Sequence, residues 1–149
     1  MNNYDEILEA LRRMQEADSA KERVVRQIKP ISGLMLIRNA KDTGGDTVPW
    51  GDWSDYWETV VDDTFPRIGS CVRCGFRKEL EGAHVWIGFD DQNYYIVPMC
   101  HECNTKDHKL FLPKVAYVMA WVDYKVCGKG DAHKAYDKQR GQNASGRTL

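Results

Sequence analysis

Cysteine spacing is the feature that most constrains how this chain folds. Four of its five cysteines form two Cys-x2-Cys pairs, Cys71/Cys74 and Cys100/Cys103, with 25 residues between the pairs. Each pair grips an ion through a tight turn, and four thiolates complete the tetrahedral coordination of a structural zinc site. Gly75 follows the first pair, as suits a zinc knuckle whose backbone amides point at sulfur. We therefore predict a structural Zn2+ that supplies on the order of 10 kcal/mol of folding free energy.

The cysteines allow other interpretations, namely a disulfide pair, an iron–sulfur site or unlinked thiols. Disulfide frameworks belong to secreted proteins, and this chain shows no basic-then-apolar leader. Its apolar runs are far shorter than the roughly 20 residues that span a bilayer. We therefore expect a protein of the reducing cytoplasm with no membrane contact. Cys127 lies outside both pairs and is interpreted as a buried or idle thiol.

Charge is distributed unevenly along the 149 residues, although the net charge is only −1. Residues 1–70 hold 9 basic and 13 acidic side chains, whereas residues 100–149 hold 9 basic and 5 acidic ones. The near-neutral total argues against a protein that binds nucleic acid over its whole surface. Any polyanion-binding surface is expected in the C-terminal third. The hydrophobic content of 42% suffices for one buried core.

The N-terminal segment has the apolar periodicity of a helix from Asn3 to about Lys29, which Pro30 would end. Asp18 and Ser19 are expected to break this helix in two. Two further segments are predicted before the tryptophans: a short strand or buried turn over Ile31–Ile37, and a loop over Lys41–Val48 that bends at Gly44-Gly45.

Three tryptophans, Trp50, Trp53 and Trp57, follow at helical spacing and predict a helix near Asp52–Asp63 with one apolar and one acidic face. One interpretation is that the tryptophans pack the N-terminal helix onto the rest of the protein. The other is that this acidic, aromatic segment is a surface for a protein partner, or even a phosphate mimic.

The C-terminal third is predicted to be helical. Val115–Val126 carries an apolar stripe of helical spacing, and Asp131–Arg140 reads as a short basic helix capped by Asp131 and closed by Gly141. His133 on that helix is expected to face solvent. Residues Gln142–Leu149 are expected to be flexible.

Between the cysteine pairs the pattern is that of a β-hairpin. Ala83–Ile87 and Tyr94–Val97 are strand-like, and the polar Gly88–Asn93 joins them. Knuckle, hairpin and a helix carrying the second cysteine pair make the treble-clef arrangement. The expected fold class is α+β, a small treble-clef zinc domain packed with N- and C-terminal helices. Three segments are expected within one compact unit: a helical acidic 1–66, a zinc-binding ββα 67–112, and a helical basic 113–149.

The run from Cys71 to His108 resembles the zinc-containing, four-cysteine branch of the HNH (ββα-metal) endonucleases. The shared features are the first Cys-x2-Cys, an Ala-His-Val strand, a Val-Pro-x-Cys-x2-Cys run and an Asn after the last cysteine. In that family a strand histidine acts as general base on water. A divalent ion held partly by the helix stabilises the phosphoryl oxygens.

The resemblance assigns roles to residues of this chain. His84 matches the general base, while Tyr95, or Asn93 two residues before it, falls near the middle asparagine. Asn104 matches the helix ligand of the catalytic ion, and His108, four residues later, would share its helix face. Lys106, Lys109 and Lys114 near the helix have two interpretations: they contact phosphates, or they are ordinary surface lysines.

The chain also departs from the family pattern. Ala83 stands where members usually place a His or Asp metal ligand. Two neutral ligands suit Mn2+, Ni2+ or Zn2+ better than Mg2+, which prefers carboxylates. Asp90, Asp91 or Glu81 would have to supply the missing charge. The alternative for His84 is a satisfied hairpin histidine, for His101 a residue beside the metal or on the surface, and for His108 a histidine at the helix C-terminus.

Three functions follow from these observations. The first is an HNH-like metal-dependent nuclease that acts on DNA or RNA, with His84 as base. The second is a catalytically decayed, zinc-stabilised binding module for a protein or nucleic acid, such as a phage or mobile-element inhibitor or regulator. The third is a zinc-stabilised transcription regulator that uses the basic helix of residues 131–140.

Overall fold

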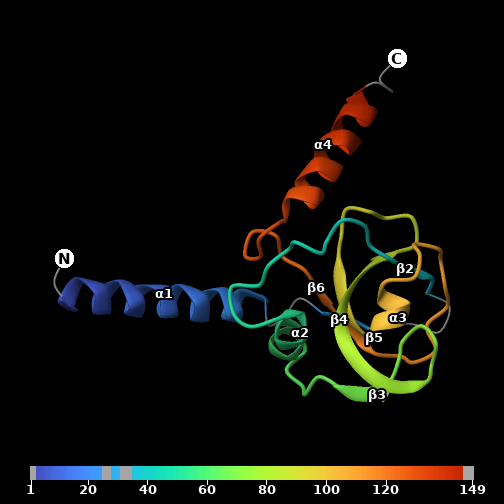
Figure 1. The fold of residues 1–149 in the computed structure, drawn as a ribbon, viewed down its shortest axis with the longest axis horizontal. Coiled ribbons are helices and arrows are strands. Elements are labelled where there is room, and N and C mark those ends of the chain that lie inside the picture. Colours follow the sequence, from blue (N-terminus) through green and yellow to red (C-terminus); the bar gives the residue numbers. More distant parts are fainter. Residues whose placement is uncertain (1–2, 25–27, 31–34, 146–149) are drawn as a thin grey trace.

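The fold is α+β, built on a curled antiparallel sheet (Figure 1). The computed structural model describes residues 3–24, 28–30 and 35–145. The sheet has the order β1-β6-β5-β4-β2, and β3 pairs with β4 off this path. Within the described residues the elements are α1 (Asn3–Val24), β1 (Ile28–Pro30), β2 (Ile37–Asn39), α2 (Trp53–Val61), β3 (Ile68–Ser70), β4 (Arg77–Ile87), β5 (Tyr95–Cys100), α3 (His101–Asn104), β6 (Val118–Trp121) and α4 (Asp131–Ser145).

The β4–β5 hairpin, which the sequence predicted, forms the centre of the sheet. Its register runs from Leu80 opposite Cys100 to Val85 opposite Tyr95, and β5 leads directly into α3. Side chains on both faces of this hairpin are buried, because α2 covers one face and the segments around β2 and α3 cover the other. Strands from all three sequence segments contribute to the sheet. In the described part of the chain, no helix has both the length and the apolar character to cross a membrane.

Helix α2 packs on the sheet and begins at a capping box, in which the Asp52 carboxylate accepts from the Asp55 amide and the Asp52 amide donates to the Asp55 carboxylate. Trp57 Nε1 donates to the Val118 carbonyl at 2.8 Å, and Tyr56 Oη donates to the Trp121 carbonyl at 2.6 Å. The tryptophan-bearing helix is therefore tied to β6. Helix α1 contacts α2, but its apolar side chains from Tyr4 to Met14 are exposed, so the tryptophans do not cover that part of the N-terminal helix.

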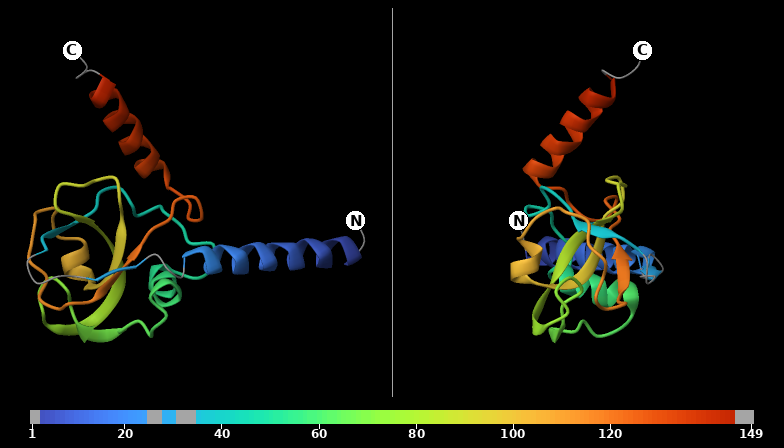
Figure 2. Two further views of the ribbon diagram at one scale, coloured as in Figure 1. Left: turned by 180° about the vertical axis from the view of Figure 1, so that it is seen from behind. Right: turned by 90° about the vertical axis from the view of Figure 1, so that its right-hand side faces the viewer.

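Helix α1 extends away from the sheet (Figures 1 and 2) and contacts the body at α2. It is continuous from Asn3 to Val24, so the predicted break at Asp18 and Ser19 is wrong. It also ends before Lys29, because residues 28–30 pair with β6 as a strand instead. Of the segment predicted as a strand or buried turn over Ile31–Ile37, residues 31–34 lie outside the described residues. Residues 41–48 form a loop, as predicted.

The predicted helix over Val115–Val126 is wrong, because Val118–Trp121 forms strand β6. Beta-branched valines serve either state, and tertiary pairing decides between them. Here β6 fills the gap between β1 and β5, with Ala120 opposite both Ile28 and Ile96.

Helix α4 starts at Asp131 as predicted but continues through Gly141 to Ser145, and residues 146–149 lie outside the described residues. His133 does not face solvent: its side chain is 0% exposed. Its Nδ1 donates to Asp46 Oδ2 at 2.8 Å, and Tyr124 Oη donates to the same oxygen at 2.6 Å. The amide of Gly130 donates to Asp46 Oδ1 at 2.8 Å. This Asp46 network (Asp46, Tyr124, Gly130 and His133) fastens the start of α4 to the loop after β2.

Candidate metal centre and its surroundings

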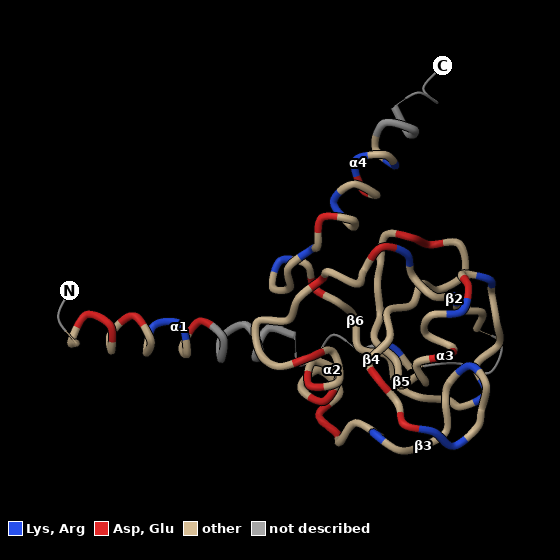
Figure 3. The backbone as a smooth tube through the Cα atoms, viewed as in Figure 1, with Lys and Arg blue, Asp and Glu red and all other residues tan. Residues whose placement is uncertain are grey.

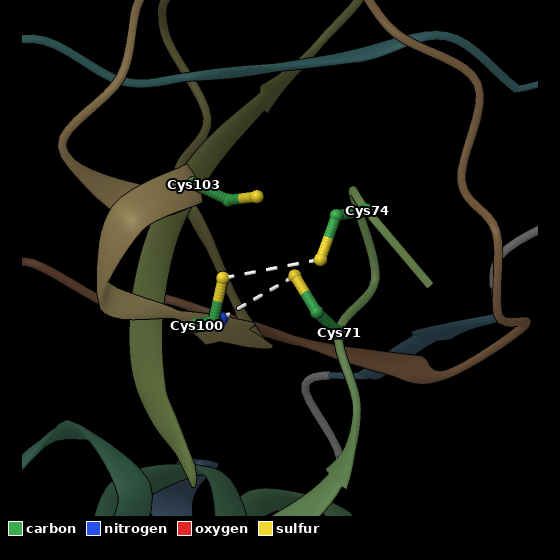
Figure 4. Close-up of side chains that lie close together, drawn as sticks. All are labelled: Cys71, Cys74, Cys100 and Cys103. Carbon is green, nitrogen blue, oxygen red and sulfur yellow. Dashed lines mark hydrogen bonds between the residues drawn. The ribbon is translucent and has the colours of Figure 1, made fainter. Parts of the chain in front are cut away.

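The four paired cysteines converge at one end of the hairpin (Figure 4). The sulfur atoms of Cys71, Cys74, Cys100 and Cys103 all lie within 4.8 Å of one another, and the Cys74 and Cys100 sulfurs are 4.0 Å apart. None of them is in a disulfide. Four sulfurs at this spacing can hold a metal ion such as zinc, as the sequence predicted. Cys127 lies outside the cluster and is buried, and burial raises the pKa of its thiol to about 12.

The first cysteine pair lies on a tight turn. Gly75 has φ +77° and donates its amide to the Cys71 carbonyl at 2.9 Å. The amides of Arg73 and Cys100 point at Cys71 Sγ, at 3.4 and 3.3 Å. Burial disfavours the Cys71 thiolate, but backbone amides outweigh that effect and lower the pKa of the thiol to about 7. These amides favour the thiolate form that a metal ion requires.

Asn39 on β2 supports the second cysteine pair. It is 2% exposed, and its Nδ2 donates to the Cys103 carbonyl at 2.7 Å. The bond satisfies a carbonyl at the end of a four-residue helix that has few intrahelical bonds of its own. The sequence carries no signal for this role of Asn39, since only the pairing of β2 with β4 brings the residue close to α3.

His84, the expected general base, is buried rather than open to solvent. Its exposed fraction is 7%, and its ring makes an edge contact with Trp53 of α2 at a centroid distance of 4.3 Å. Burial lowers the pKa of the imidazole to about 4. Its Nε2 has no hydrogen-bond partner among the described residues. A histidine in this position is neutral at pH 7 and lies beneath the tryptophan.

The residues expected to assist His84 lie elsewhere. Tyr95 pairs with Val85, so strand alternation points it to the opposite face of the sheet from His84. Asn93 accepts a bond from Trp121 Nε1 at 3.1 Å, and its Nδ2 donates to Asp90 at 2.9 Å. The structure therefore does not bring Tyr95 or Asn93 to the imidazole.

Asn104 and His108 do not share a helix face, because α3 ends at Asn104. Asn104 Nδ2 donates to Glu81 Oε1 at 2.8 Å, and His108 Nδ1 lies 2.9 Å from the Asn39 carbonyl oxygen. Glu81 is thus the one candidate carboxylate beside Asn104, and it also lies 2.9 Å from Nδ1 of the exposed His101. Asp90 and Asp91 belong to the hairpin turn, where Asp91 accepts from Tyr136 of α4.

Basic side chains surround the cysteine turn. Arg73 bonds Asp107 and the Lys114 amide donates to the Val72 carbonyl at 2.7 Å, so the segment after α3 lies against the turn. Four cations here are exposed and have no ion pair within the part of the chain that the structure describes, and the neighbouring Phe76 is 69% exposed. We call this surface the basic knuckle face; it comprises Phe76, Arg77, Lys106, Lys109 and Lys114.

The basic knuckle face and the acidic face of α2 lie in different parts of the molecule (Figure 3). Arg67, which lies between α2 and β3, offsets part of the negative charge of α2 by forming ion pairs with Asp55 and Glu58. The lysines of the basic knuckle face were candidates from sequence. Phe76 and Arg77 were missed, although an aromatic and a cation directly after a knuckle glycine are a readable signal.

Comparison with known proteins adds no relative to this picture: no family model matches the chain, and no match was found among curated proteins or solved structures.

Proposed function

We propose that this chain is a zinc-stabilised module that binds nucleic acid through the basic knuckle face and does not hydrolyse it. In this proposal Cys71, Cys74, Cys100 and Cys103 hold one structural Zn2+, which fixes the turn that carries Phe76 and Arg77. The observation that carries the proposal is that the segments flanking the four cysteines carry exposed cations without an ion pair among the described residues, namely Arg77, Lys106, Lys109 and Lys114, together with the exposed ring of Phe76. Lysine and arginine contact phosphates, and an exposed ring stacks on unpaired bases.

The surroundings of His84 support binding rather than hydrolysis. A general base must reach the proton that it removes, directly or through one water. Here Trp53 covers the imidazole, and a pKa of about 4 makes it a weak base. In this proposal the likeness to HNH endonucleases concerns only the scaffold. This is the second function considered from the sequence, a treble-clef zinc domain that has lost its catalytic site.

Binding is tested by fluorescence anisotropy with labelled single-stranded and duplex oligonucleotides of DNA and RNA, over a range of salt concentrations. The parent protein is expected to prefer single strands and to lose affinity steeply as salt rises. Replacing Lys106, Lys109 and Lys114 together with Glu is expected to weaken binding more than about tenfold. The matched control replaces three exposed lysines away from this face, Lys125, Lys134 and Lys138, with Glu. Equal loss in both triple variants, or no salt-dependent binding by the parent, contradicts the proposal.

Phe76→Ala separates stacking from charge. We expect it to weaken single-strand binding by about 1–3 kcal/mol, roughly 5- to 150-fold, and to change duplex binding little. The nuclease alternative is tested by plasmid nicking with Mg2+, Mn2+ or Ni2+. Cleavage by the parent protein that His84→Ala abolishes would replace the present proposal with an HNH-like hydrolase.

A further inference from the structure

Arg73 lies inside the turn of the first cysteine pair, yet little of its side chain is in contact with solvent. The exposed fraction of the side chain is 10%. The guanidinium lies over the ring of Phe111, with its carbon 4.7 Å from the ring centroid. It also donates to the Asp107 carbonyl at 3.2 Å and to Asp107 Oδ1 at 2.5 Å. A stacked guanidinium with two acceptors on one residue holds that residue in a defined position, unlike a pair of exposed charges.

Asp107 lies between two lysines of the basic knuckle face, Lys106 and Lys109. Residues 105–110 form neither helix nor strand, so their path depends on contacts with other segments. Asp107 Oδ1, the oxygen that accepts from Arg73, also accepts from the Lys109 amide at 3.1 Å. The bond from Arg73 holds the pKa of Asp107 below its usual value, so the carboxylate is charged at neutral pH. Arg73 is therefore linked to the backbone of Lys109 through a single oxygen atom.

A carboxylate between two lysines that bind phosphate is unfavourable by charge alone, because it repels the phosphate. The contacts of Arg73 give Asp107 a different role, since they use the carboxylate to fasten the lysine segment to the cysteine turn. Lys114 is fastened to the same turn, because its amide donates to the Val72 carbonyl at 2.7 Å. The cysteine turn thus anchors both segments that carry the lysines of the basic knuckle face.

We propose that Arg73 is a positioning residue that passes the order of the cysteine turn to Lys106 and Lys109, so that oligonucleotide binding depends on the metal centre through the Arg73–Asp107 pair. This inference rests on the proposed nucleic-acid binding. An ion held by four cysteines fixes the turn that carries Arg73. Binding costs less free energy when the contacting groups are already ordered, so lysines on an anchored segment bind more tightly than lysines on a loose one.

Asp107→Ala tests the proposal by the sign of its effect. Charge alone predicts that loss of an acidic side chain between two lysines strengthens binding, whereas loss of the anchor weakens it, by about three- to tenfold. Fluorescence anisotropy of the full zinc-loaded chain with a labelled single-stranded oligonucleotide measures the change. The matched control is Glu102→Ala, which removes an acidic side chain that is 84% exposed and pairs with Lys78. The control is expected to bind equally well or more tightly. Stronger or unchanged binding by Asp107→Ala overturns the proposal.

A double-mutant cycle separates positioning from direct contact of Arg73 with phosphate. Arg73→Leu keeps an apolar side chain on Phe111 and removes both bonds to Asp107, so it is expected to weaken binding by about the same factor as Asp107→Ala. The double variant is expected to lose no more than either single variant, because both changes break the same pair. A further loss in the double variant means that Arg73 itself contacts the nucleic acid, and overturns the positioning role.

Hydrogen–deuterium exchange tests the link without nucleic acid. In zinc-loaded Arg73→Leu, amides of residues 105–110 are expected to exchange about tenfold faster than in the parent, whereas those of the β4–β5 hairpin stay protected. Native mass spectrometry checks that the variant keeps one metal equivalent. Unchanged exchange at residues 105–110 overturns the role of Arg73 by itself. A parent protein that binds no oligonucleotide overturns the proposed function, and with it the part of Arg73 in binding.

Discussion

The four-cysteine centre and the Asp46 network perform the same task by different means. Each fastens a segment with little regular structure of its own, the turn after β3 in one case and the loop after β2 in the other. The four cysteine sulfurs lie close enough together to hold an ion taken from solution, whereas Asp46 is satisfied entirely by donors of the chain. We therefore expect the first region to depend on metal supply and the second to depend only on side chains and amides of the chain.

Of the predicted changes, metal removal should lower the stability of the protein most. A strong chelator is expected to remove a contribution on the order of 10 kcal/mol and to unfold the hairpin end, because four cysteine side chains would remain together without an ion. Thermal unfolding with and without chelator measures the loss. Cys100→Ser should abolish the metal equivalent, while the buried but unligating Cys127 can be changed to Ala with metal content kept. A chelated protein with an unchanged melting temperature would show that the cysteines are not a structural site.

Breaking the Asp46 network should be the next largest change. Asp46→Ala leaves His133 Nδ1, the Tyr124 hydroxyl and the Gly130 amide without their acceptor, at an expected cost of about 3–5 kcal/mol. Urea unfolding monitors the loss, and zinc content should stay at one equivalent because the two regions are separate. Asp42→Asn, in the same loop but exposed, serves as the control and should change little, because Asn removes the charge and tolerates the positive φ of this position.

Acid should act through His84, which neither region contains. Its pKa is depressed from 6.5 to about 4 in the folded protein, so protonation favours the unfolded state. Stability is then complete above about pH 6.5 and falls as the pH drops toward 4, by about 3 kcal/mol at most. Thiolate protonation also acts in acid, so the useful measurement is the stability of the parent minus that of His84→Leu at each pH. A difference that stays constant from pH 7 to pH 4 would contradict the depressed pKa.

Tyr124→Phe should have the smallest effect of the four. It removes one donor to Asp46 but leaves those from His133 and Gly130, so about 1 kcal/mol is expected in urea unfolding. A loss as large as that of Asp46→Ala would mean that the tyrosine, and not the carboxylate, organises this corner.

The parts of the fold that the sequence predicted are those encoded locally. The cysteine pairs and the β4–β5 hairpin are set by spacings and turns within a few residues, and both appear where expected. The valine stripe around β6 failed because its residues suit helix and strand alike, and only its neighbours β1 and β5 choose between them. The catalytic roles of His84 and the residues expected to assist it remain a prediction that rests on the family resemblance alone. The structure places these residues apart.

Contacts between residues that are far apart in the chain could not be predicted from the sequence. His133 sits in a run of polar residues that predicts exposure, and its burial depends on Asp46, 87 positions away. Asn39 depends in the same way on the carbonyl of Cys103, 64 positions away. Periodicity describes which face of an element is apolar, but it cannot identify a single buried polar residue whose partner lies in another segment.

The pairing of β1 with β6 has a consequence for how the protein is made. Residues 28–30 are synthesised early, yet the strand that completes them ends at Trp121. During translation β1 has no partner until nearly the whole sheet has emerged from the ribosome, and the edge of β6 is equally open until β1 arrives. The cysteine turn and hairpin, whose contacts are closer in sequence, can assemble first and offer β6 a template. The sheet is therefore expected to close last at the strand that directly follows α1.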